Sequence, residues 1–122
     1  PASPVTPSSY ADTTGEITKA PSDEFAALNR EDVWIFSVEV RSSDSTFTWQ
    51  KYNDTTGEWV NVPITTAEDG FNANWEKLES GGARAKLIAN KITNASFGKY
   101  RCMITTKGGS TILTSEATLS QG

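Results

Sequence analysis

Hydrophobic and polar residues alternate most clearly along the stretch 33–41. The apolar side chains that a period of two places on one face are Trp34, Phe36, Val38 and Val40. The polar side chains between them fall on the opposite face. Such alternation is typical of a β-strand that is buried on one side, because successive side chains of a strand point in opposite directions. We therefore expect a half-buried strand here, followed by a turn at 42–45.

The stretch 46–52 alternates in the same way, with Phe47 and Trp49 on the expected buried side and Gln50 and Tyr52 on the other. Turn-forming residues at 53–57 separate it from a second apolar run at 58–62, and this arrangement predicts a β-hairpin. Across such a hairpin, Trp59 is expected to pack on Tyr52, as aromatic cross-strand pairs do.

The second half of the chain contains further strand-like runs at 85–89, 99–106 and 111–119. The last two flank Lys-Gly-Gly-Ser at 107–110, which is a strong hairpin signal. Between 63 and 82 the pattern is ambiguous, and residues 75–78 could form one short helical turn. The count is about seven short strands separated by polar turns, which predicts an antiparallel β-sandwich or a β-barrel.

Three residues, Trp49, Tyr100 and Cys102, decide between a sandwich and a barrel. A tyrosine two positions before a cysteine, downstream of a core tryptophan, resembles the immunoglobulin pattern of strand C and the tyrosine corner of strand F. The resemblance covers about residues 17–120 and implies an all-β, immunoglobulin-like Greek-key β-sandwich. Such domains usually carry a strand B cysteine about 11–14 residues before the tryptophan. Here Val38 is the candidate for its replacement. The implied core landmarks are Val38, Trp49, Leu87, Tyr100 and Cys102.

Residues 1–16 differ in composition from the rest of the chain, because they are rich in Pro, Ser and Thr and contain few apolar side chains. A segment of this kind buries too little apolar surface to offset the entropy lost on ordering. We therefore expect 1–16 to be a linker or arm and 17–122 to be the immunoglobulin-like domain.

Composition narrows the classes of partner and cofactor. The net charge is −4 and the basic residues are scattered, which argues against nucleic acid and against an anionic membrane surface as the main ligand. The longest apolar runs are too short for a membrane-spanning helix, so no membrane insertion is expected. The chain has no His and one Cys, so an internal disulfide and a Cys-based zinc site are impossible. No cofactor and no metal are expected.

A more specific resemblance follows from 48–51 and 57–62, which are similar to disulfide-free immunoglobulin-like domains of bacteria and their phages. It implies a non-enzymatic binding or display domain on a capsid or tail protein, located at the virion surface. The arm would join the virion or cell-surface protein body, and the domain would attach weakly to a host-surface glycan. Two alternatives stay open, namely a module of a bacterial adhesin on the extracellular surface and an intracellular structural domain of the muscle type.

Tyr52, Trp59 and Lys107 are the candidate binding residues. Aromatic rings can stack on sugars, and the loops at the ends of a sandwich commonly host binding sites. The alternative interpretation is structural packing and ordinary turns. Acidic residues such as Asp54 could bind calcium, but no cluster has a repeated ligand spacing, so solvated charges are expected. For Cys102 no His is present to activate the thiol. No catalytic residues are expected.

Overall fold

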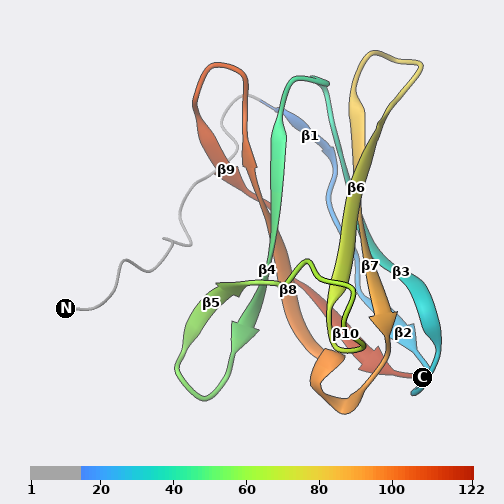
Figure 1. The fold of residues 1–122 in the computed structure, drawn as a ribbon. Coiled ribbons are helices and arrows are strands. Elements are labelled where there is room, and N and C mark those ends of the chain that lie inside the picture. Colours follow the sequence, from blue (N-terminus) through green and yellow to red (C-terminus); the bar gives the residue numbers. More distant parts are fainter. Residues whose placement is uncertain (1–14) are drawn as a thin grey trace.

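The computed structural model describes residues 15–122, which form two β-sheets packed face to face (Figure 1). The predicted arm at 1–16 therefore lies almost wholly outside the described residues. The first sheet contains, in spatial order, β1 (Ile17–Lys19), β3 (Glu31–Val40), β7 (Ala83–Lys91) and β6 (Phe71–Lys77). The second contains β2 (Glu24–Ala26), β10 (Ala117–Gln121), β8 (Gly98–Thr105), β4 (Thr46–Asn53) and β5 (Glu58–Asn61), with β9 (Thr111–Leu113) also paired to β8. A short 3-10 turn, η1 (Asn94–Ser96), precedes β8.

The strand order is that of an immunoglobulin-like sandwich, although residues 15–122 contain ten short strands where about seven were predicted. The first strand of the pattern is divided between the two sheets as β1 and β2, and Pro21 lies in the connection, where its missing N–H removes a ladder donor. The last strand is divided into β9 and β10. At that break, Thr114 N donates to Cys102 O at 3.0 Å and Thr114 Oγ1 accepts from Cys102 N at 2.9 Å.

The core lies between the sheets and contains all five landmark residues. Val38, Leu87, Tyr100 and Cys102 have no exposed surface, and Trp49 is 3% exposed. The ring of Phe36 from the first sheet lies 6.4 Å from that of Trp49 and 5.2 Å from that of Tyr100, measured between centroids. These contacts connect β3 to β4 and β8, so the two sheets share one aromatic cluster.

The prediction that Trp34 shares the buried face of Phe36 is wrong. A β-bulge interrupts the pairing of β3 with β7, because Trp34 pairs with Ile88 and Phe36 pairs with Leu87. The extra residue, Ile35, is buried together with Phe36, and Trp34 is turned outward and is 51% exposed. A bulge adds one residue to one strand and shifts the alternation of side chains beyond it. The displaced indole donates from Nε1 to Phe36 O at 3.1 Å and lies 4.6 Å from Lys86 Nζ.

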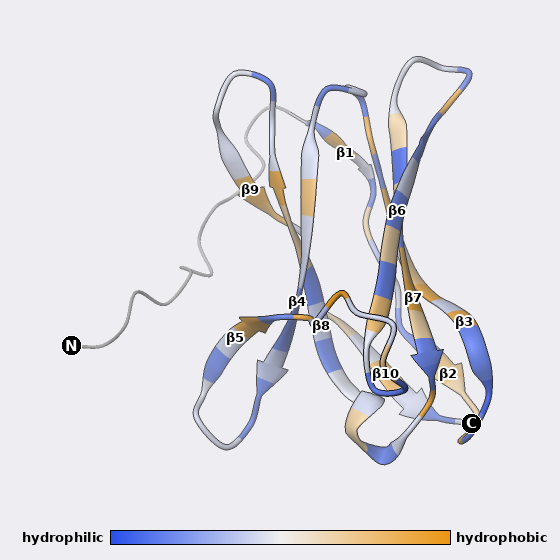
Figure 2. Ribbon diagram, in the orientation of Figure 1, coloured by the Kyte–Doolittle hydropathy of each residue, from blue (hydrophilic) through white to orange (hydrophobic). Residues whose placement is uncertain are grey.

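The possible helical turn at 75–78 is also wrong, because residues 71–77 form the edge strand β6. Every residue of β6 pairs with β7, and Phe71 packs on Tyr100 with ring centroids 6.1 Å apart. Figure 2 shows hydrophilic and hydrophobic residues alternating along this strand. The pattern was hard to recognise in the sequence because an edge strand is less buried, and Trp75 is 50% exposed.

Tyr100 forms a tyrosine corner with the turn before its own strand. Its hydroxyl donates to Ser96 O, and Thr93 N in turn donates to Ser96 Oγ at 2.9 Å. Burial raises the pKa of the Tyr100 hydroxyl, and burial also raises the pKa of the Cys102 thiol. Both groups therefore keep their protons in the folded chain at pH values where the unfolded chain loses them.

The free energy of unfolding should fall as the pH rises above about 9, where cysteine and then tyrosine ionise in the unfolded chain. A group with a raised pKa in the folded state contributes its stability below the unfolded pKa and loses it above that value. The slope should approach about 1.4 kcal/mol per pH unit for each group. Urea unfolding from pH 7 to 11 measures it, and Tyr100→Phe should show a shallower loss above about pH 10. An identical slope in that variant would contradict the assignment.

Candidate functional site

Two aromatic and two basic side chains form a row on the outer face of the second sheet. Tyr52 on β4 is paired in register with Trp59 on β5, and their rings lie 5.3 Å apart at an angle of 58°. The predicted cross-strand packing of these two rings is confirmed. Lys99 Nζ lies 5.6 Å from the Tyr52 ring, and the guanidinium carbon of Arg101 lies 4.2 Å from the Trp59 ring. Both distances are within the range of cation–π interactions.

Arg101 is 2% exposed although it lies on the outer face of the sheet. Its Nε donates to Gln50 Oε1 at 2.9 Å, and Gln50 Nε2 donates to Asn61 Oδ1 at 3.0 Å. Burial lowers the pKa of the Arg101 guanidinium, and the charge of Glu116 opposes that shift. The row therefore rests on a buried polar network that holds the guanidinium against Trp59.

Sequence reasoning missed this network. The alternation correctly placed Gln50 on the face opposite Trp49, but that face was expected to be exposed, and Gln50 is buried. The available signal was an arginine on the strand next to two aromatic residues, since a guanidinium stacks well on an aromatic ring. One consequence is that one side of the Trp59 indole is already occupied by Arg101.

A groove with a volume of about 450 Å³ lies beside Tyr52, between the β4–β5 hairpin and η1. Amide and carboxyl side chains contribute hydrogen-bonding groups, and they are Asn53, Asp54, Asn61 and Asn94. Apolar surface comes from Tyr52, Val60, Val62, Pro63, Phe71 and Phe97. Asn53 Oδ1 accepts from the backbone N–H groups of Thr55 and Thr56 at 2.9 and 3.2 Å, which holds the hairpin turn. The groove thus combines an aromatic ring with amide side chains from the β4–β5 hairpin and from η1.

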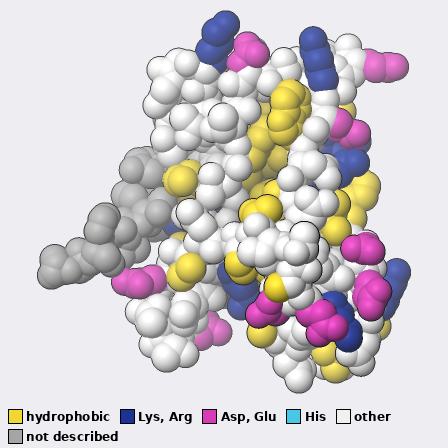
Figure 3. All heavy atoms as spheres, in the orientation of Figure 1, with side chains coloured by type: hydrophobic (Ala, Val, Ile, Leu, Met, Phe, Trp, Pro, Cys, Tyr) yellow, Lys and Arg dark blue, Asp and Glu magenta, His cyan; other side chains and the backbone are white. Residues whose placement is uncertain are grey.

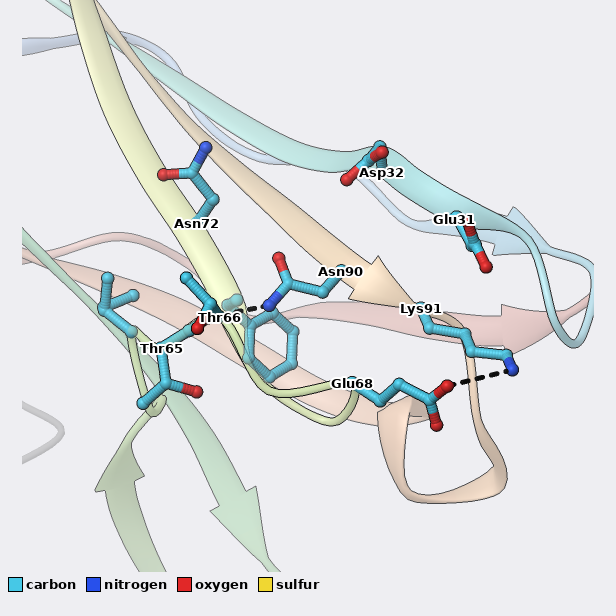
Figure 4. A pocket seen from close by; sticks show the side chains of 10 residues that line it. Glu31, Asp32, Thr65, Thr66, Glu68, Asn72, Asn90 and Lys91 are labelled. Atoms are coloured by element: carbon cyan, nitrogen blue, oxygen red, sulfur yellow. Dashed lines mark hydrogen bonds and ion pairs between the residues drawn. The ribbon is translucent and has the colours of Figure 1, made fainter.

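A larger pocket, about 630 Å³, lies elsewhere, between β6, the end of β7 and the start of β3 (Figure 4). Its wall is held by Asn90, whose Nδ2 donates to Thr65 O at 2.7 Å and to Ala67 O at 2.8 Å. Lys91 Nζ pairs with Glu68 Oε2 at 3.4 Å. The two hydrogen bonds of Asn90 and the ion pair of Lys91 hold the 65–68 segment against β7. Within residues 15–122, no group of three or more acidic, His or Cys side chains could hold a metal ion.

The structure does not bring Lys107 together with Tyr52 and Trp59. Lys107 lies in the hairpin between β8 and β9, next to the Thr46 end of β4, and Tyr52 lies at the other end of that strand (Figure 1). Its side chain is 79% exposed and its Nζ lies 3.7 Å from Asp44 Oδ2. The three candidate binding residues therefore belong to two separate places.

Nucleophilic chemistry at Cys102 is disfavoured by its position. The thiol is fully buried, and burial raises its pKa, so the thiolate that acts as a nucleophile is not formed near neutral pH.

Among residues 15–122, the structure contains no helix with the length and hydrophobicity of a transmembrane span.

Comparisons with known proteins bear on the fold. No family model matches the chain, and no curated protein matches its sequence. Among solved structures, an I-band fragment of titin is 18% identical with a TM-score of 0.52, over 86% of this chain and 31% of that fragment. A chimeric titin Z1Z2 protein, functionalised with an exogenous peptide from decorin, is 12% identical with a TM-score of 0.55, over 87% of this chain and 92% of that one. The RIG-5 IG1 homodimer is 17% identical with a TM-score of 0.56, over 87% and 95%.

These likenesses agree with the strand order and with the buried Trp49 and Tyr100. The predicted fold class is confirmed. The chain is an all-β, two-sheet immunoglobulin-like sandwich that lacks the disulfide bridge between its sheets.

Proposed function

We propose that this domain is a non-enzymatic binding module displayed on a phage virion, where it attaches weakly to carbohydrate on the host surface. The observation that carries the proposal is the groove beside Tyr52, which joins an aromatic ring to a set of amide and carboxyl side chains. Binding sites of this type use apolar surface for contact and a few polar groups for orientation.

The groove is lined by one basic and one acidic residue, Lys51 and Asp54, so its formal charges balance and its chemistry suits an uncharged sugar. The amide of Asn94 has donors and an acceptor, as sugar hydroxyl groups require, and Asn53 offers its Nδ2 donor, because its Oδ1 already accepts from Thr55 N and Thr56 N. Tyr52 supplies an apolar ring face at the margin. Trp59 supports the site indirectly, because it packs on the Tyr52 ring and is itself held by Arg101. A shallow groove with one aromatic ring implies low affinity for a single copy, which becomes useful when many linked copies act together.

Display on a virion is supported by two features of the sequence. Residues 1–16 have the composition of a tether, through which the domain would join a capsid or tail protein body. The segments 48–51 and 57–62 resemble disulfide-free domains of phages and bacteria. A module of a bacterial adhesin on the extracellular surface would use the same groove, and the reading frame upstream of Pro1 distinguishes the two.

Glycan-array binding of the domain, displayed in many copies on a particle, tests the proposal. Tyr52→Ala should reduce the apparent affinity at least about fivefold, because the loss of an aromatic contact worth about 1 kcal/mol or more corresponds to a change of that size. Lys107→Ala is the matched control, since this exposed residue lies at the opposite end of the sheet and should leave binding unchanged.

The absence of glycan binding by the multimerised domain would contradict the attachment role. That result would favour a second candidate, an intracellular structural domain of the muscle type. The free, buried Cys102 favours this second candidate, because a core that is complete without a disulfide bridge keeps its stability in a reducing compartment.

A further inference from the structure

Among the described strands that lie at a sheet edge, β6 is the longest (Figure 1). It has seven residues, whereas β1, β2, β5 and β9 have three or four. Short length, proline and bulges are among the means by which proteins keep an edge strand from pairing with another chain. β6 lacks all three, because residues 71–77 contain no proline and pair with β7 without a shift in register.

The hydrogen bonds at the two ends of β6 show which of its backbone groups face away from β7. Leu78 N donates to Gly82 O at 2.8 Å, within the hairpin that leads to β7. Phe71 N donates in the opposite direction, to Pro63 O at 2.9 Å. Because the backbone groups of successive residues in a strand alternate in direction, the even-numbered positions of β6 face β7 and the odd-numbered positions face the open edge.

Three residues therefore present their N–H and C=O groups at this edge, and they are Ala73, Trp75 and Lys77. Within residues 15–122, no strand pairs with these six groups, since β6 is the last strand of its sheet. Phe71 is already covered, because it forms an isolated parallel bridge with Ile64. The free edge is thus a regular row of three donors and three acceptors.

A second copy of β6 matches this row when it lies antiparallel to the first and the two Trp75 residues stand opposite each other. Ala73 then pairs with Lys77 of the second copy, and Lys77 pairs with its Ala73, so all six groups of each strand are used. A register centred on Glu76 would instead set two carboxylates against each other. Because the same strand serves both copies, the contact is symmetric and closes as a dimer.

The side chains that meet in this register are complementary. On the outer face, Asn74 lies opposite Glu76 of the second copy, and an amide can donate to a carboxylate. Glu76 Oε2 already pairs with Arg84 Nη1 at 2.8 Å and with Lys86 Nζ at 3.4 Å, so its charge is compensated. On the inner face, Lys77 lies opposite an alanine. No like charges stand opposite each other, an arrangement that would destabilise paired strands.

Trp75 supplies apolar surface at the centre of the contact. Its side chain is 50% exposed, and beside it lies a solvent-open cavity of about 180 Å³ whose apolar lining includes Phe47, Trp49 and Ala73. Figure 3 shows apolar side chains gathered in a hollow in the upper half of this face. Residues that stand opposite each other in an antiparallel pair point to the same face, so the Trp75 rings of two copies meet beside the cavity. Pairing therefore removes apolar surface of both indoles from water.

We propose that β6 pairs with β6 of a second copy of this chain, in the register centred on Trp75, and joins the two four-stranded sheets into one continuous sheet. A contact made by one pair of strands buries little surface, so the association is weak and reversible. The proposal does not depend on the carbohydrate groove, and either can fail without the other.

Sedimentation and amide hydrogen exchange of the 122-residue chain test the proposal together. In a concentration series up to about 1 mM, the average mass should rise toward twice that of the monomer. As the dimer forms, the amide hydrogens of Ala73, Trp75 and Lys77 should become protected from exchange. The amide hydrogens of Asn74 and Glu76 should be protected throughout, because they face β7.

Lys77→Pro tests the backbone bonds, and Lys77→Ala is its matched control. The proline variant removes an N–H that faces the open edge and is not used in pairing with β7, a position where edge strands tolerate proline. The alanine variant shortens the same side chain but keeps the N–H. Lys77→Pro should weaken association at least several-fold relative to Lys77→Ala, and thermal unfolding checks that both variants fold.

Asn74→Glu tests the register. Asn74 is opposite Lys86 on β7, so a carboxylate at this position is favourable within one copy. Across the contact it faces Glu76 of the second copy and should weaken association several-fold at low salt, and added salt should reduce the effect. Asn72→Glu is the matched control, because this position faces no acidic residue of the second copy in the proposed register.

A chain that remains monomeric at about 1 mM overturns the proposal and leaves the edge of β6 to a strand of a different protein. The proposal is also overturned if the chain associates but Lys77→Pro associates as tightly as Lys77→Ala, because another surface would then form the contact. Association in which Ala73, Trp75 and Lys77 keep exchanging as fast as in the monomer leads to the same conclusion.

Discussion

Replacing Trp49 by alanine should lower the free energy of unfolding by about 3–5 kcal/mol. The indole is 3% exposed, and its ring lies 6.4 Å from that of Phe36 on the opposite sheet. Removing it opens a cavity in the aromatic cluster shared by the two sheets, and close-packed β-strands cannot collapse to fill that space. Urea unfolding of the wild type and the variant at neutral pH measures the difference.

Trp34→Ala is the matched control for this experiment. The control removes the same side chain from β3, where it is half exposed and held by a hydrogen bond to Phe36 O and by Lys86. Its loss should be less than half of the loss in Trp49→Ala, because much less apolar surface returns to water. A folded Trp49→Ala protein with the wild-type unfolding midpoint would show that the core is wrongly assigned.

Replacing Val38 by cysteine should allow a disulfide bridge to Cys102 and raise the free energy of unfolding by about 2–4 kcal/mol. Phe36 and Tyr100 are in ring contact at 5.2 Å, and β3 and β8 run in the same direction (Figure 1). Val38 and Cys102 come two residues later on each strand, so they point from the two sheets toward the same level of the core. For a loop of this length the chain-entropy model gives a gain between about 3 kcal/mol (15 residues) and about 4.7 kcal/mol (100 residues), and the expected gain is lower because strain in the folded state opposes it.

Comparison of the oxidised and reduced forms of Val38→Cys isolates the bridge from the cost of replacing valine. Val40→Cys is the control. Val40 is as buried as Val38 but lies two residues further along β3, so this variant should keep both thiols free. Mass spectrometry of the folded proteins counts the thiols. If Val38→Cys folds and both thiols remain free under oxidising conditions, Val38 does not occupy the position of the strand B cysteine.

The candidate site was partly predictable because part of it is local. Tyr52 and Trp59 are joined by one short hairpin, and the turn residues at 53–57 set the register that places their rings together. The groove beside Tyr52 was not predictable, because Asn94 and Phe97 reach it from a turn that is distant in the sequence. Lys107 was grouped with these residues only because sandwich loops share a role, and the direction of β4 places it at the other end.

The sequence by itself determined the fold class and the buried centre. Alternation with a period of two and polar turns specify short strands, and Trp49, Tyr100 and Cys102 mark the core in the correct order. Tertiary structure alone decided the outward turn of Trp34, the strand at 71–77, the buried outer-face network of Arg101 and Gln50, and the cavity beside Trp49. The physical reason is that a strand's own residues set its alternation, while a bulge, an edge or a buried polar group depends on the neighbouring strand.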